Sequence, residues 1–184
     1  HVGNFGGKSL WPTLNEGYDL RSYLHLYTYI FLCFTYLMVI MLGSHDRYVK
    51  GLLRRLFGSQ YKIDKYYTYV KYAEGSAQID GVIVFSDCEI AVEIESRTAK
   101  QVRGALLDLF FHRARKKLLI IVPEYMYDPQ ALKKDAEYIL SELKKIRPDI
   151  NFKVVILKGS GNDPKHEEDS VILKKAVEEL RSLS

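Results

Sequence analysis

The chain has 184 residues, of which 47% are hydrophobic, 12% aromatic and 27% charged, and this composition excludes a disordered, collagenous or low-complexity protein. The length suits one ordinary domain with an appendage, and the formal net charge of +4 permits an anionic partner without requiring one. The two cysteines, Cys33 and Cys88, lie in very different surroundings, which excludes a disulfide scaffold and a cysteine-based zinc site.

Residues 1–43 form an apolar N-terminal segment. No Lys, Arg, Asp or Glu occurs between Arg21 and Asp46, and residues 23–43 are long enough to cross a bilayer as a helix. Because basic residues follow closely, such a span would anchor residues 44–184 on the cytoplasmic side of a membrane. Two alternatives stay open: part of the run is buried core, or Met41 is the true start and the preceding residues lie outside a cytoplasmic functional protein.

Residues 44–184 form a second region, for which the sequence pattern predicts an α/β domain. Residues 45–57 have apolar side chains at helical spacing and end at Gly58. Runs rich in β-branched and aromatic residues predict three strands, at 66–72, 78–85 and 89–96, the last two joined by a tight turn at Ser86 and Asp87. Thr98 and Gln101 form a capping box that opens a helix over 98–115.

The rest of this region alternates strands and helices. Residues 117–122 and 152–158 are short apolar runs typical of strands buried on both faces, and Asp128 and Pro129 begin a helix that Pro148 ends. A polar loop over 159–168 leads to a last helix over 168–183. Antiparallel strands followed by parallel crossovers predict a three-layer α/β fold, with a mixed sheet flanked by helices.

The hairpin 78–96 carries the most informative pattern. Side chains alternate between the faces of a strand, so matching the two apolar faces fixes the register. This register pairs Ile79 with Ile94 and Ile83 with Ile90. It therefore sets Asp80 opposite Glu93, and Gln78 opposite Glu95.

Opposed carboxylates have Cβ atoms about 5 Å apart, and like charges at that spacing are destabilising. No basic residue occurs within either strand, whereas a divalent cation would neutralise the pair. Oxygen ligands in this arrangement suit Mg²⁺, with Mn²⁺ as a substitute. The alternative interpretation is a solvated sheet face with scattered acids.

The segment after Glu95 adds positive charge. The chain passes directly into a helix N-terminus, where unpaired amides and the helix dipole favour an anion such as phosphate. Three basic residues lie within the first turn and a half: Arg97, Lys100 and Arg103. Acids that hold a metal, beside cations that hold phosphate, are the components of metal-assisted phosphodiester hydrolysis.

The spacing of the acidic residues resembles the motif of the PD-(D/E)xK, restriction-endonuclease-like nuclease superfamily. In this chain the motif is Asp80, a gap of twelve residues, Glu93-Ile94-Glu95 and a following helix. The resemblance covers about residues 45–158 and implies a core of order αβββαβ, here with an αβα extension. The chain departs from the pattern at two positions. Ile79 stands where the family has proline, and Glu95 stands where the family usually has lysine.

The resemblance implies a metal-dependent DNA nuclease. Asp80 and Glu93 would bind Mg²⁺, and Glu95 would complete the metal shell or orient the attacking water. Lys100, or else Arg97, would stabilise negative charge in the transition state. Gln101 would contact the water or the nucleic acid, unless it serves only the capping box. By analogy with the family, a homodimer is also expected.

DNA is the expected polymer, with phosphate contacts from Arg97, Lys100, Gln101 and Arg103 and from Lys50 and Arg54 on the first helix. Two other functions remain open. One is a catalytically inactive module of the same fold that binds nucleic acid or another partner. The other is a small nucleotide- or phosphate-binding domain, for which the only glycine-rich signal is Gly159-Ser160-Gly161.

Overall fold

The structure, a computed structural model, describes residues 28–29, 44–123 and 126–183. Apart from residues 28–29, these residues belong to one unit, described here by itself. The predicted membrane span over 23–43 lies outside the described residues, except for Thr28 and Tyr29. Within the described part of the chain, no helix combines the length and the apolar character that a membrane crossing needs.

The main sheet has five strands in the spatial order β1, β4, β5, β6 and β7. They comprise β1 (Tyr61–Lys62), β4 (Gly81–Val84), β5 (Glu89–Glu95), β6 (Lys116–Ile121) and β7 (Asn151–Ile156). The first two pairings, β1 with β4 and β4 with β5, are antiparallel, and the pairings of β5 with β6 and β6 with β7 are parallel. The predicted change from antiparallel hairpin to parallel crossovers is confirmed.

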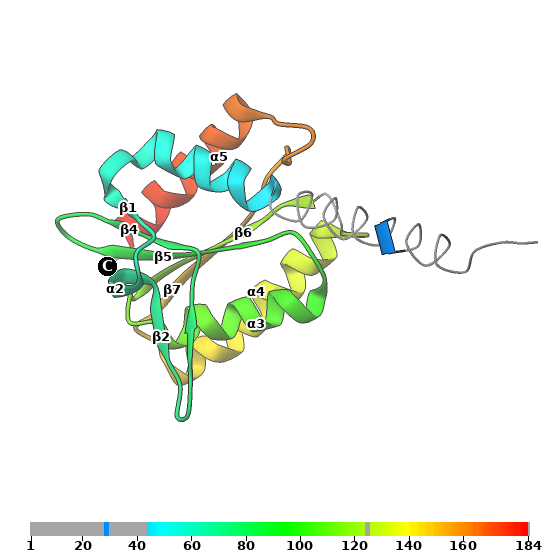
Figure 1. Cartoon of the computed structure of the whole chain (residues 1–184). Coiled ribbons are helices and arrows are strands. Elements are labelled where there is room, and N and C mark those ends of the chain that lie inside the picture. Colours follow the sequence, from blue (N-terminus) through cyan, green and yellow to red (C-terminus); the bar gives the residue numbers. More distant parts are fainter. Residues whose placement is uncertain (1–27, 30–43, 124–125, 184) are drawn as a thin grey trace, which may run out of the picture. The chain divides into compact units, whose positions relative to one another are not determined.

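A second, two-stranded sheet pairs β2 (Tyr69–Lys71) with β3 (Ser76–Gln78). The helical elements are residues 44–57, the 3₁₀ turn η1 (Gly58–Gln60), α2 (Lys65–Thr68), α3 (Ala99–Phe111), α4 (Pro129–Ile146) and α5 (His166–Ser182). Helix 44–57 and α5 cover one face of the main sheet, and α3 and α4 cover the other (Figure 1). The molecule is therefore a mixed α/β fold in three layers.

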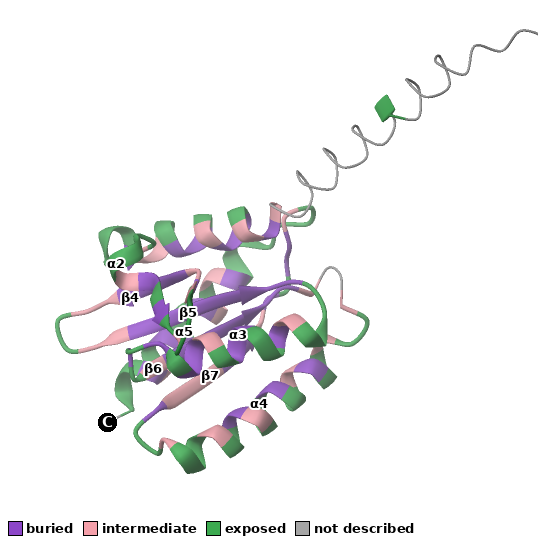
Figure 2. Ribbon diagram, turned by 60° about the horizontal axis from the view of Figure 1, so that its bottom comes forward, coloured by how far each residue is buried: buried purple, intermediate pink, exposed green. Residues whose placement is uncertain are grey.

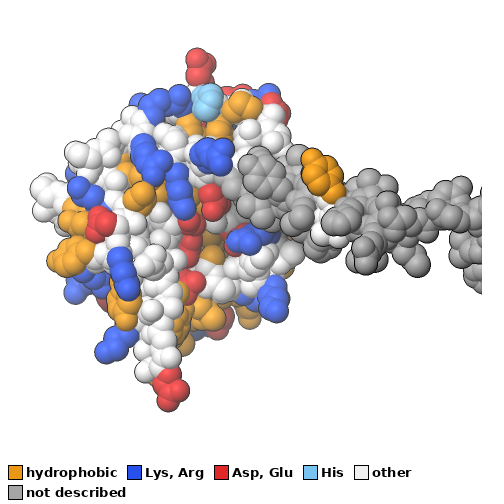
Figure 3. All heavy atoms as spheres, in the orientation of Figure 1, with side chains coloured by type: hydrophobic (Ala, Val, Ile, Leu, Met, Phe, Trp, Pro, Cys, Tyr) orange, Lys and Arg blue, Asp and Glu red, His pale blue; other side chains and the backbone are white. Residues whose placement is uncertain are grey.

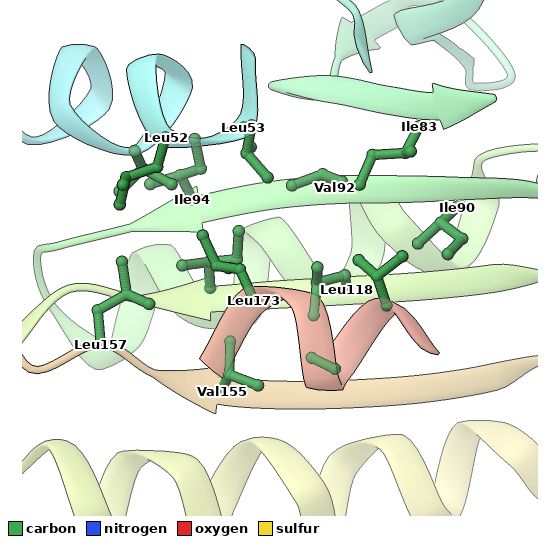
Figure 4. Packing of buried hydrophobic residues seen from close by; sticks show 14 of the residues in the cluster. Leu52, Leu53, Ile83, Ile90, Val92, Ile94, Leu118, Val155, Leu157 and Leu173 are labelled. Atoms are coloured by element: carbon green, nitrogen blue, oxygen red, sulfur yellow. The ribbon is translucent and has the colours of Figure 1, made fainter. Parts of the chain in front are cut away.

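Each face of the sheet has its own hydrophobic core. On one side, Leu52 and Leu53 of helix 44–57 and Leu173 of α5 pack against β5 residues Val92 and Ile94 (Figure 4). On the other side, apolar residues of α3 and α4 pack against Ala91, Leu119 and Val154. Burial is greatest along the central strands and on the inward sides of the helices (Figure 2).

The helix starts agree with the sequence pattern. The Thr98 backbone N–H donates to Gln101 Oε1 at 3.0 Å, completing the predicted capping interaction of α3. At α4, the Ala131 N–H donates to Asp128 Oδ1 at 2.9 Å, and Pro129 occupies the first turn. These side chains satisfy amides that would otherwise lack intrahelical partners.

The predicted strand over 66–72 is wrong in its first half, which belongs to α2. The Tyr67 and Thr68 amides bond to the Asp64 carbonyl, which also accepts the Thr68 hydroxyl at 3.1 Å. This turn outweighs the β propensity of the tyrosines, because propensity is a weak prior that local hydrogen bonding overrides. Only Tyr69–Lys71 forms a strand.

The predicted strand over 78–85 is interrupted. The register of its second half is confirmed, since Ile83 pairs with Ile90, but Gln78 pairs with Tyr69 and not with Glu95. Ile79 packs in the α3 core and not beside Ile94. The reason is that β3 turns to pair with β2, so Ile79 and Asp80 lie between two ladders.

Candidate functional site

The interruption before β4 creates the candidate site. At the end of β5, residues Glu93 to Glu95 remain paired with β6 on one side, while the ladder between β4 and β5 ends at Gly81 opposite Val92. The Asp80 carboxylate occupies the position that a continued strand would take, because the Ile94 N–H donates to Asp80 Oδ2 at 2.9 Å. A charged side chain therefore satisfies a strand amide here.

Tyr61 and Gly81 hold Asp80 in this position. The Tyr61 hydroxyl donates to the Asp80 carbonyl at 3.0 Å, and the ring lies directly over Gly81. A Cβ on Gly81 would lie 2.2 Å from Tyr61 Cε2, a separation that side chains do not tolerate. The glycine thus allows the close approach of strand and ring that fixes the carboxylate.

An open cleft of about 610 Å³ surrounds Asp80. Acidic residues and two basic residues line it: Asp46, Asp80, Glu93, Glu95, Arg97 and Lys100. Figure 3 shows this face of the molecule, with acidic side chains in a hollow flanked by Lys and Arg side chains. The cleft therefore combines carboxylates with cations at the surface.

Glu93 and Asp80 are in direct contact, as the predicted register required. Glu93 is only 7% exposed, and burial raises its pKa well above the usual range. The negative charge of Asp80 and a hydrogen bond between the two side chains raise the pKa further, while the Asp80 backbone amide opposes the rise. Burial and the neighbouring negative charge therefore both favour the neutral form of Glu93.

Lys50 balances the negative charge of Asp80. Its Nζ lies 2.6 Å from Asp80 Oδ1, and it comes from helix 44–57 rather than from either strand. The opposed acids therefore have a neighbouring positive charge that the pattern of the two strands did not indicate. Lys50, expected to contact nucleic acid, contacts Asp80 in this structure.

Glu95 has a different environment from the other two acids. Its Oε1 accepts hydrogen bonds from the backbone amides of Ser96 and Arg97, both at 3.1 Å, and from Arg97 Nε at 3.2 Å. The residue is 6% exposed, and its charge is balanced by the adjacent arginine. Glu95 thus anchors the turn between β5 and α3.

Asp46 is a further acidic residue of the cleft that the sequence pattern did not indicate. It lies one helical turn before Lys50 and lines the same cleft. Burial and the charge of Asp80 raise its pKa, whereas Lys50 and Arg97 lower it. The i,i+4 spacing of Asp46 and Lys50 was visible in the sequence, but nothing local indicated that their helix meets Asp80.

The remaining predicted residues fall into two groups. Lys100 and Gln101 line the cleft at the start of α3, where Gln101 also caps the helix. Arg103 instead lines a small pocket between α3 and α4, and Arg54 is exposed on helix 44–57. The structure therefore brings Lys100, Gln101 and Arg97 to the acids, but not Arg103.

The donor set fits a hard divalent ion at two carboxylates. Mg²⁺ commonly takes only one or two protein carboxylates and keeps several waters, and Asp80 and Glu93 provide two at the cleft. Within the described ranges, no three His, Cys, Asp or Glu side chains are grouped as a metal site. Glu95, expected as a third ligand, is directed to Arg97.

The Gly159-Ser160-Gly161 segment offers little to a phosphate group. The Gly159 N–H donates to Asp169 Oδ2, the Ser160 N–H to the Asp163 carbonyl, and the Gly161 N–H to His45 Nδ1. Because these amides bond within the protein, they do not form an outward-facing phosphate cradle. This geometry weighs against the phosphate-binding alternative.

The chain matches no protein-family model, and no curated protein or solved structure is significantly similar to it. Functional inference therefore rests on the fold and on the chemistry of the cleft.

Proposed function

We propose that this chain is a metal-dependent nuclease that hydrolyses phosphodiester bonds of DNA. The observation that carries the proposal is the contact between Asp80 and Glu93 at the open cleft, next to the N-terminus of α3. The order of strands and helices, and the position of these acids at the end of a hairpin, resemble the PD-(D/E)xK nucleases. The restriction-endonuclease-like core is part of the same proposal.

Asp80 and Glu93 would hold one Mg²⁺ or Mn²⁺ ion. Bound there, the ion would polarise the scissile phosphate and lower the pKa of an attacking water. Arg97 and Lys100, together with the positive end of the α3 helix dipole, would orient the phosphate group and balance its developing charge. Glu95 would keep Arg97 at the edge of the cleft through their ion pair.

The test compares two glutamates of the same strand. Glu93→Gln should lower Mg²⁺- or Mn²⁺-dependent cleavage of plasmid and single-stranded DNA by at least about a hundredfold. Asp80→Asn should have a similar effect. Glu89→Gln is the matched control, because Glu89 lies on the same strand and pairs with Arg113 outside the cleft. Equal cleavage by the Glu93 and Glu89 variants would refute the proposal.

One observation favours a second candidate, an inactive module that binds nucleic acid. Asp80 is already paired with Lys50, and Glu95 with Arg97, so both carboxylates have cationic partners within the protein. For such a module, DNA binding would weaken steeply with salt, and the wild-type protein would cleave no substrate at any Mn²⁺ concentration. Cleavage that depends on Asp80 would exclude it.

A further inference from the structure

We propose that Lys50 is a built-in competitor for the cation at this site, pairing with Asp80 in the metal-free protein and turning to the substrate phosphate once an ion is bound. This inference rests on the proposed function and concerns the regulation of the same site. It begins from the ion pair between Lys50 Nζ and Asp80 Oδ1 at 2.6 Å.

The two oxygens of Asp80 have different tasks. Oδ2 accepts the Ile94 N–H at 2.9 Å, so this oxygen is held by the edge of β5. Oδ1 is the oxygen that Lys50 contacts, and it is therefore the one on which an incoming cation and Lys50 would compete. A unit positive charge at this oxygen also repels a nearby divalent ion.

Asp46 provides Lys50 with another partner. It lies four residues earlier on the same helix, at a spacing that allows side-chain ion pairs, and it lines the cleft beside Asp80. Once displaced from Asp80, the ammonium group would remain in the cleft between Asp46 and the phosphate. Glu95 stands where the PD-(D/E)xK nucleases usually have a lysine. Lys50 of helix 44–57 would supply the positively charged side chain in its place.

If Lys50 and the metal ion compete for Asp80, removing Lys50 should improve metal binding and at the same time impair catalysis. In calorimetric titration with Mn²⁺ alone, Lys50→Met should bind about tenfold more tightly than the wild type, since one positive charge is lost near the ion. DNA cleavage at saturating Mn²⁺ should fall by about a hundredfold. Lys50→Arg keeps the charge and should retain the wild-type Mn²⁺ affinity.

Arg47→Met is the matched control, because Arg47 is exposed on the same helix, whereas the partner of Asp80 is Lys50. It should leave Mn²⁺ affinity within about twofold of the wild type, which separates competition at Asp80 from a general loss of charge. Lys50→Gln is a second neutral variant should the methionine disturb folding. It should also bind Mn²⁺ more tightly.

The outcomes separate the two proposals. If the wild type binds Mn²⁺ and cleaves DNA, but neither neutral Lys50 variant binds the ion more tightly, only the role of Lys50 is overturned. If the wild type binds no Mn²⁺ at millimolar concentration, the proposed function and the role of Lys50 are both overturned. Tighter binding in both neutral variants, with unchanged affinity in Arg47→Met, supports the role of Lys50.

Discussion

Lys117 is a buried lysine of β6, and it does not line the cleft of the candidate site. Its Nζ donates to the His112 carbonyl at 2.6 Å, which satisfies a backbone oxygen at the end of that helix. Burial lowers the pKa of Lys117 to about 7. The folded protein therefore favours the neutral amine, in contrast to the unfolded chain, where an ordinary lysine stays protonated to about pH 10.

This difference predicts how stability depends on pH. Between pH 7 and 10 the unfolded chain binds more protons at this position, so the contribution of Lys117 to the free energy of unfolding rises with pH. Lys117→Met removes that contribution, and its stability relative to the wild type should fall by roughly 3–4 kcal/mol from pH 7 to pH 10. Urea unfolding at several pH values measures the difference, and parallel profiles for the two proteins would contradict the prediction.

The residues of the candidate site were only partly predictable from the sequence. The alternation of apolar and polar side chains in two short strands joined by a tight turn is a local signal. It correctly predicted that Asp80 lies beside Glu93. Lys50 and Asp46 reach the same place through the packing of a helix some thirty positions away, which no local period encodes. Gly81 was a further local signal for this site, because a glycine in a strand pattern indicates that another group approaches the backbone closely.

Two glycines lie on the exposed sides of helices, Gly51 in helix 44–57 and Gly104 in α3. Apart from the adjacent residues and the backbone of its own helix, a Cβ added at either position would meet no atom of the described residues within 4 Å. Glycine within a helix costs about 1 kcal/mol relative to alanine, so each is unfavourable for the helix alone. Gly104 differs from Gly51 in lining the cleft.

Alanine substitutions at these positions separate stability from access to the cleft. Gly51→Ala and Gly104→Ala should each raise the free energy of unfolding by about 1 kcal/mol, as measured by urea denaturation. Only Gly104→Ala should also raise the KM for DNA, because its methyl group would stand where the polymer backbone approaches α3. A KM that is unchanged in both variants would place the DNA path elsewhere.

At the scale of elements, helices were predicted better than strands. The caps at Thr98 and Asp128 are local, and α3 and α4 begin within a residue of the expected positions. The strand errors at 66–72 and 78–85 share one cause. Pairing of β2 with β3 draws this part of the chain out of the main sheet, and such pairing depends on contacts between segments rather than on composition.

Across the whole molecule, Asp169 connects elements that are far apart in sequence. The carboxylate is fully buried and accepts hydrogen bonds from the Tyr48 hydroxyl at 2.6 Å, the Lys158 amide at 2.7 Å and the Gly159 amide at 3.1 Å. Tyr48 in turn accepts the Lys165 amide. One side chain therefore joins helix 44–57, the end of β7 and α5.

Removing this connection should destabilise the whole fold. Asp169→Ala leaves a buried hydroxyl and two amides without their acceptor and should cost about 3 kcal/mol or more, whereas Tyr48→Phe should cost about 1–2 kcal/mol. Urea unfolding of both variants and of the double variant measures the coupling between the two side chains. Additive effects would mean that the hydrogen bond contributes little.

The joining of helix 44–57 to α5 also has a consequence during biosynthesis. Tyr48 and Asp169 are separated by 121 positions, so the helix emerges from the ribosome long before its covering partner has been made. At a translation rate of about 5–20 residues per second, the leucines of this helix lack the cover of α5 for roughly 6–24 s. The apolar side of this helix therefore stays without the cover of α5 until translation passes residue 182.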